Sequence, residues 1–151
     1  MIKIIVVGNI KENYLKEAIL EYKKRIHKYT DIDIVEVKDE GLVEKERALK
    51  LEGEKIEKHL NRKDYIVTLE IEGKQYTSKE FADKLNQIMI ENSNLVFIIG
   101  GSYGLSKNIK ERAKLHLSFS KLTFPHQLFR VLLLEQIYRS YKIINNESYH
   151  K

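Results

Sequence analysis

The amino-acid sequence predicts an α/β fold, a mainly parallel β-sheet with helices on both of its faces. Two observations support this class. Five short segments rich in β-branched and other apolar residues recur along the chain, and a segment with helical spacing of its apolar residues follows each of them. Most of these segments are apolar on both sides, as strands are when both faces of a sheet are covered.

The strands can be assigned in order from their residue patterns. The first is a β-branched run closed by Gly8, the second alternates polar and apolar residues, and the others are mostly apolar runs. They are expected at residues 2–8, 31–37, 65–73, 95–101 and 115–124.

The helices follow from the 3.6-residue period and from their start signals. Thr77 and Glu80 have the spacing of a capping box, and Pro125, the only proline in the chain, suits the start of a helix because its missing N–H costs little there. The first helix carries apolar residues from Leu15 to Tyr29, and the others are expected at 44–61, after Thr77, at 105–114 and after Pro125.

The last helix is apolar on nearly all sides. Its apolar residues run from Leu128 to Ile144 and do not form a single stripe. Such a helix needs cover on every side, and one small domain offers little more than its own sheet. We therefore expect part of this helix to contact a second subunit in a symmetric homodimer.

Composition narrows the class of protein. The 151 residues suit one compact domain, so residues 1–151 are taken as a single domain. There is no cysteine, which excludes a disulfide framework and a thiolate nucleophile and fits a cytoplasmic location. No signal peptide or membrane-spanning run is recognisable.

The positive charge is unevenly distributed. Residues 1–99 hold 18 Lys and Arg against 19 Asp and Glu, whereas residues 100–151 hold nine against three. A basic C-terminal half suits a polyanion such as RNA, because cationic side chains near phosphates release counterions. Ordinary solubilising surface charge is an equally good interpretation of this pattern alone.

Ligands of parallel α/β sheets bind beyond the carboxyl ends of the strands. The first strand exit, GNIKEN, lacks the glycines of a dinucleotide-binding loop, and no Walker phosphate loop occurs. The fourth exit, IIGGSYGL, has three glycines that would let a ligand approach the backbone, although a tight turn explains them as well. The fifth exit supplies Ser120, Lys121 and Thr123 as polar groups for a ligand. Alternatively, Lys121 is a solvated charge and Thr123 caps the helix that follows.

Four separated motifs resemble one known family. VTLEIEGK (67–74), FIIGGSYGL (97–105), LSFSKLTFPHQLFRVLLLEQIYR (117–139) and the final SYHK (148–151) occur in the order typical of the ribosomal large subunit methyltransferase H family, a SPOUT-class group of knotted methyltransferases. The resemblance runs nearly end to end, and residues 38–60 are its least distinctive part.

The resemblance implies methyl transfer from S-adenosyl-L-methionine to N3 of a pseudouridine in 23S rRNA, on the assembled ribosome. It also implies a homodimer and a C-terminal trefoil knot, one of the rare exceptions to unknotted folds. The cofactor contacts implied by position are Leu69, Gly100, Phe119, Ser120, Lys121, Leu122, Thr123 and Phe124.

The catalytic candidates lie in the tail. His150 could act as the general base, because imidazole titrates near neutrality and the tails of similar proteins are thought to reach the partner's active site; Tyr149 lies beside it. Alternatively, both residues contact RNA or order the tail. His126 is expected to be structural, the other histidines, His116 among them, show no partner pattern, and no metal site is expected.

Several basic residues are candidates for RNA binding. They are Arg130, Arg139, Lys142, Lys151 and Lys107, with Tyr103 available to stack on a base. The alternative function is a non-catalytic ribosome-associated RNA-binding module, which would not need a cofactor pocket. A flavodoxin-like small-molecule binder is disfavoured because GNIKEN does not resemble a phosphate-binding loop.

Overall fold

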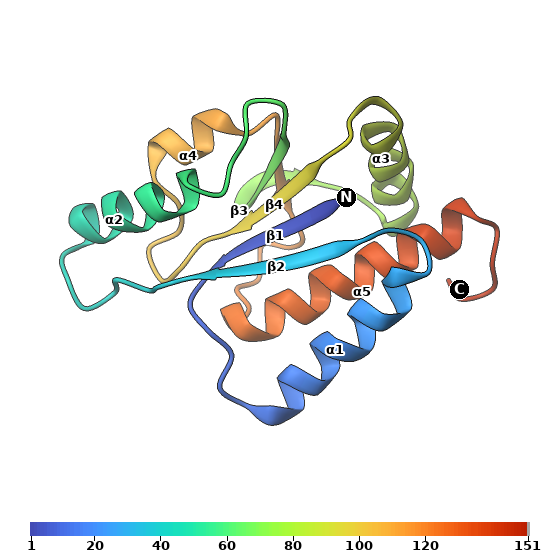
Figure 1. Ribbon diagram of the computed structural model, residues 1–151, viewed down its shortest axis with the longest axis horizontal. Coiled ribbons are helices and arrows are strands. Elements are labelled where there is room, and N and C mark those ends of the chain that lie inside the picture. Colours follow the sequence, from blue (N-terminus) through green and yellow to red (C-terminus); the bar gives the residue numbers. More distant parts are fainter. Residues whose placement is uncertain (151) are drawn as a thin grey trace.

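A computed structural model of the protein describes residues 1–150 and contains five strands and five helices (Figure 1). The strands are β1 (Ile2–Val7), β2 (Ile32–Val37), β3 (Tyr65–Gln75), β4 (Leu95–Ile99) and β5 (Leu115–Ser118). The helices are α1 (Asn13–His27), α2 (Lys45–Glu57), α3 (Ser78–Glu91), α4 (Lys107–Arg112) and α5 (His126–Ile144).

The five strands form one parallel sheet in the order β2-β1-β4-β3-β5. The central pairings are regular, with Ile4 opposite Phe97 and Val67 opposite the same residue from the other side. The β3–β5 pairing shifts register between Leu69 and Lys74. All strands therefore end at the same edge of the sheet, where the loops after β3, β4 and β5 are neighbours.

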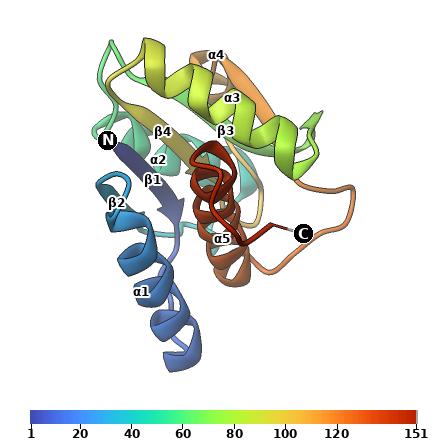
Figure 2. The same cartoon turned by 90° about the vertical axis from the view of Figure 1, so that its right-hand side faces the viewer.

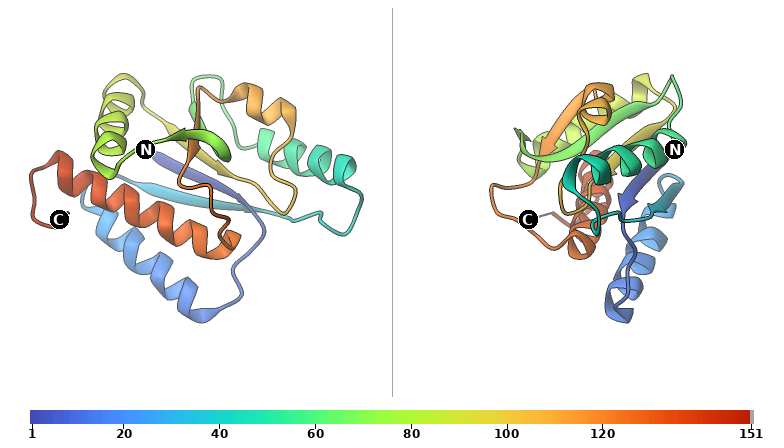
Figure 3. Two further views of the ribbon diagram at one scale, coloured as in Figure 1. Left: turned by 180° about the vertical axis from the view of Figure 1, so that it is seen from behind. Right: turned by 90° about the vertical axis from the view of Figure 1, so that its left-hand side faces the viewer.

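Helices cover both faces of the sheet, as the sequence predicts. Helices α1, α3 and α5 pack on one face and α2 and α4 on the other (Figures 1, 2 and 3). Strand β1 shows why both faces are apolar: Ile4 and Val6 point into the core under α1, α3 and α5, whereas Ile5 and Val7 point into the core under α2 and α4. The predicted α/β class with a parallel sheet is confirmed; the trefoil knot stays a prediction.

The fifth strand is shorter than the predicted range 115–124. It pairs with β3 only as far as Ser118. Phe119 leaves the sheet and packs its ring against Phe129 of α5, at 4.9 Å between centroids, and against Phe81 of α3 at 6.4 Å. Burial among these rings draws residues 119–125 away from the strand and into a loop.

The start signals of two helices are confirmed. Thr77 and Glu80 form the capping box of α3, with both reciprocal hydrogen bonds present. Pro125 is the N-cap of α5, whose first residue is His126. Thr123 therefore does not cap this helix and lies in the loop before it.

Helix α5 is covered by the sheet, α1 and α3, which bury Leu133, Leu134 and Ile137 completely. The first turn is less covered, and Leu128 stays 39% exposed. In residues 1–150 no helix is long and apolar enough to span a membrane.

Candidate active site

The carboxyl ends of β3, β4 and β5 meet at one pocket. Seven of the eight residues predicted to contact the cofactor line it, and Lys121, on the exposed side of its loop, does not. The pocket-lining residues are Leu69, Glu70, Ile71, Ile99, Gly100, Gly104, Leu117, Ser118, Phe119, Ser120, Leu122, Thr123, Phe124, His126 and Phe129. Residues far apart in sequence thus form one cavity because their strands are neighbours in the sheet.

The first wall is the glycine-rich loop after β4. Gly104 donates its N–H to the carbonyl of Gly101 at 3.0 Å, and Gly104 has a φ of +81°, which favours glycine. A Cβ added to Gly100 would lie 2.5 Å from the carbonyl oxygen of Gly104. The loop can adopt this tight turn only with glycine at these positions.

The second wall is the loop 119–125. Its backbone is folded on itself: Ser120 accepts the N–H of Leu122 at 3.0 Å on its Oγ, and its carbonyl accepts the hydroxyl of Ser118 at 3.2 Å. Phe124 packs against Phe129 at 6.1 Å between centroids. Two aromatic rings and several hydroxyls therefore line the same cavity.

Glu70 is the one acidic residue of this pocket. Its Oε2 accepts the hydroxyl of Thr68 at 2.6 Å and contacts His116 Nδ1, and Lys110 lies 3.5 Å from its Oε1. Burial alone would raise the pKa of Glu70, but the hydrogen bonds from Thr68 and His116 outweigh it and lower the pKa below its usual value. The carboxylate is therefore held ionised at the pocket wall.

His116 thus has partners that the sequence pattern did not reveal. Its Nδ1 also lies 2.9 Å from Thr68 Oγ1. The pairing of Thr68 with His116 in adjacent strands, 48 residues apart, creates this contact. Even so, the described residues contain no cluster of three metal-ligating side chains.

Arg130 lies inside the protein, directly after Phe129 of the pocket wall. Its side chain is 2% exposed; it donates to Glu36 Oε2 at 2.6 Å and to the carbonyl of Gly8 at 2.9 Å. Gly8 has a φ of +98°, and Glu36 also accepts the N–H of Ile10. Arg130 therefore ties α5 to the exits of β1 and β2, and its guanidinium is not available at the surface of the chain to contact RNA.

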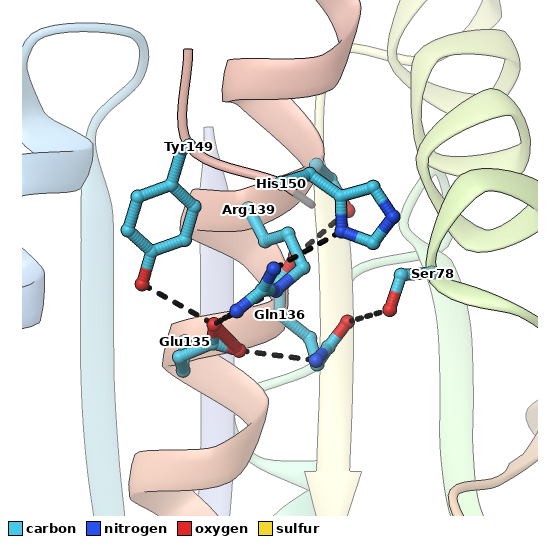
Figure 4. A network of polar contacts seen from close by, with 7 residues as sticks. Ser78, Glu135, Gln136, Arg139, Tyr149 and His150 are labelled. Carbon is cyan, nitrogen blue, oxygen red and sulfur yellow. Dashed lines mark hydrogen bonds and ion pairs between the residues drawn. The ribbon is translucent and has the colours of Figure 1, made fainter.

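The tail packs on the C-terminal half of α5 (Figure 4). Tyr149 donates its hydroxyl to Glu135 at 3.3 Å, and its ring packs against Tyr138 and Arg139. His150 Nδ1 lies 3.0 Å from Arg139 Nη1, and Arg139 is itself paired with Glu135. Because a guanidinium can only donate, Nδ1 of His150 accepts this hydrogen bond.

Glu147 of the tail forms ion pairs with two lysines. Glu147 pairs with Lys142 at 3.1 Å, with Lys28 at 3.3 Å and with the hydroxyl of Tyr29 at 2.7 Å. Among the predicted RNA contacts, Lys142 and Arg139 are both in ion pairs within this chain. Lys107 lies 3.8 Å from Glu111. The candidate stacking residue Tyr103 is 40% exposed. Lys151 lies outside the described residues.

The tail and the pocket lie at opposite ends of α5. His126 and Phe129, at its start, line the pocket, whereas His150 contacts Arg139. Arg139 follows His126 by 13 positions, which corresponds to about 20 Å along a helix. His150 is therefore remote from the pocket of its own chain.

Comparison with known proteins shows the family of this chain. The family model described as Predicted SPOUT methyltransferase matches residues 1–150. The chain belongs to the SPOUT methyltransferase family.

Individual relatives place the chain more narrowly, in the ribosomal RNA large subunit methyltransferase H family. The protein of that name from Caldicellulosiruptor saccharolyticus is 51% identical, with 100% of both chains covered, and the one from Clostridium botulinum (strain Hall) is 48% identical with 99% of each covered. A protein of Methanococcus maripaludis, provisionally given the same name, is 56% identical with 99% of each covered.

Proposed function

We propose that this protein transfers a methyl group from S-adenosylmethionine to N3 of a pseudouridine in 23S rRNA of the large subunit, acting on the assembled ribosome. The observation that carries the proposal is the convergence of three strand exits on one pocket, with Leu69, Gly100 and the loop 119–124 at its wall. The relatives named as ribosomal RNA methyltransferases support the class of substrate.

The pocket residues fit such a cofactor. Phe119 and Phe124 offer apolar surface to an adenine ring, the glycine-rich loop lets its backbone approach a ligand, and Ser120 and Thr123 supply hydroxyls. Glu70 brings a negative charge toward a ligand that carries a sulfonium cation. When bound, the cofactor supplies an electrophilic methyl group.

The protein's main task is to hold donor and acceptor in line, because orientation alone can lower the barrier by several kcal/mol. N3–H of pseudouridine lies between two carbonyls and is only weakly acidic, so a base that accepts its proton assists the transfer. His150 is the proposed base. Burial and the negative charge of Glu135 raise the pKa of Tyr149, so this phenol stays protonated and serves as a hydrogen-bond donor.

A homodimer would bring the tail to a pocket. His150 is remote from the pocket of its own chain, so it can act there only from a second subunit. The incompletely covered first turn of α5, where Leu128 is exposed, is a suitable contact surface beside the pocket. In this arrangement each active site combines the cofactor pocket of one subunit with the tail of the other.

Binding of RNA is assigned to the basic C-terminal half, with Arg139, Lys142 and Lys151 as contacts and Tyr103 and Tyr149 available for stacking. Arg139 and Lys142 would exchange their present carboxylate partners for phosphates. Arg130 is left out of this set because it is buried.

One experiment tests cofactor, substrate and context together. The protein is incubated with methyl-labelled S-adenosylmethionine and, separately, with free 23S rRNA, isolated subunits and assembled ribosomes, and the labelled nucleotide is mapped. Label at N3 of one pseudouridine, in assembled ribosomes above all, is expected. Binding to ribosomes without any binding of S-adenosylmethionine by calorimetry would instead support a non-catalytic RNA-binding module.

A further inference from the structure

Helix α2 packs directly against the loop that joins the glycine-rich turn to α4. At Gly53 the helix comes so close that an added Cβ would lie 2.9 Å from Ser106 Oγ. The same Ser106 oxygen accepts the N–H of Ile109 and caps α4. This part of α2 therefore lies against the segment that begins at the cofactor pocket.

The residue before Gly53 is a buried carboxylic acid. Glu52 is only 3% exposed, and its Oε2 accepts the N–H of Glu40 at 2.8 Å, in the loop that follows β2. Its other oxygen, Oε1, is buried and has no hydrogen-bond partner in residues 1–150. A buried polar atom without a partner is unfavourable and calls for an explanation.

The unpartnered oxygen faces the glycine-rich loop. Oε1 lies 3.5 Å from the position that a Cβ would take on Gly101. Gly101 stands between Gly100 and Gly104, which both line the pocket, and its carbonyl already accepts the N–H of Gly104. Because a carboxylate only accepts hydrogen bonds, the backbone groups of this loop that can pair with it are N–H donors.

We propose that Glu52 is a positioning residue for the cofactor loop: in the cofactor-bound form, its Oε1 accepts a backbone N–H of residues 100–104 and holds the loop in its binding conformation. This inference rests on the proposed function, since it takes S-adenosylmethionine as the ligand. Glu52 contacts no reacting atom; it acts through the loop. With this hydrogen bond, both oxygens of the carboxylate have an acceptor role, one toward Glu40 and one toward the loop.

The surroundings make this role dependent on pH. Burial raises the pKa of Glu52, as do the negative charge and the close side-chain contact of Asp39, while the N–H of Glu40 opposes the shift. The charged groups near it are Asp39, Glu40 and the Lys55 that pairs with Glu40; Val7 of β1 and Gly101 bring no charge. Protonation neutralises the carboxyl group and makes it a weaker acceptor of the loop N–H, so affinity should fall as pH drops through the pKa of Glu52.

The variant Glu52→Gln tests the proposal, because an amide can satisfy Glu40 or the loop but not both. Binding of S-adenosylmethionine is measured by calorimetry at several values between pH 5 and 7, beside Glu54→Gln, an exposed position on the same helix. We expect Glu52→Gln to bind about tenfold more weakly than wild type at pH 7, with the difference shrinking toward pH 5. Equal affinities of wild type and Glu52→Gln across this range would overturn the proposal.

A second measurement decides the matter if Glu52→Gln does not fold. Amide hydrogen exchange of residues 100–104 is followed in the wild-type protein with and without S-adenosylmethionine. Slower exchange in the bound form is expected, and unchanged exchange of these amides would contradict the role of Glu52. If the wild-type protein bound no S-adenosylmethionine at all, the proposed function itself would fail, which is a different result.

Discussion

The two ends of α5 are built in different ways. At its start, residues of three strand exits form the pocket, with glycine at positions where no side chain fits. At its end, the tail is held by side-chain contacts around Glu135, Arg139 and Glu147, several of them partly exposed. The pocket is thus fixed by the sheet, whereas the tail is held by contacts of the kind that individually contribute little, so it can be released toward another partner.

The largest effect, on binding of S-adenosylmethionine, is expected at Gly100, where the pocket has no room for a side chain. In Gly100→Ala, the new Cβ would lie 2.5 Å from the carbonyl oxygen of Gly104, so the backbone of this pocket wall must shift. We expect binding of S-adenosylmethionine to fall below detection by calorimetry. Ser102→Ala, an exposed position in the same loop, is the control and should bind like wild type. Normal binding by Gly100→Ala would mean that this loop is not part of the cofactor site.

The strand exits could be predicted because strand ends and loop composition are local properties of the sequence. The apolar run 95–99 ends at two glycines, and Pro125 marks the start of α5. Strand order then brings these exits together, which follows from the general behaviour of parallel sheets.

The contacts that the sequence did not reveal are all long-range. His116 meets Glu70 only through the register of β5 against β3, and Arg130 meets Glu36 across 94 residues. Glu52 reaches Gly101 only because α2 lies on the same face of the sheet as α4. A local pattern carries no information about such pairings. For the same reason, the sequence predicts that Arg130 contacts RNA, although its side chain is buried.

The next effect concerns the tail. In His150→Ala, we expect binding of S-adenosylmethionine to stay unchanged while single-turnover methylation of ribosomes slows by about 100-fold, the lower end of what a general base contributes. His150 must first leave Arg139, because its Nδ1 accepts a hydrogen bond there. His59→Ala, far from the tail in sequence and not part of the pocket, is the control. An unchanged rate in His150→Ala would remove this residue as the base.

A smaller effect, on the free energy of unfolding, is expected at Arg130, which lies between the two ends of α5. Arg130→Met removes the donors to Glu36 and to the carbonyl of Gly8 while keeping an apolar stem of similar length. Because Glu36 is 43% exposed and can be solvated, we expect a loss of about 2 kcal/mol in the free energy of unfolding, less than for a fully buried pair. Urea denaturation measures it, with Arg25→Met in an exposed pair as the control. Equal losses in both variants would show that burial of Arg130 adds nothing.

The smallest effect concerns the acid sensitivity of the tail. Hydrogen bonds from Tyr29 and Lys142 lower the pKa of Glu147 from 4.5 to about 2. A group whose pKa is lower in the folded state stabilises that state above its unfolded pKa, and this contribution is lost as pH falls through the folded pKa.

Wild type should therefore be more stable than Glu147→Gln above pH 4.5, and the difference should disappear as pH approaches 2. Thermal unfolding midpoints between pH 2 and 6 measure the difference, and Glu111→Gln, in a single exposed pair with Lys107, serves as the control. If the difference for Glu147→Gln did not change with pH, the carboxylate would not be what holds the tail to residues 28–29 and to α5.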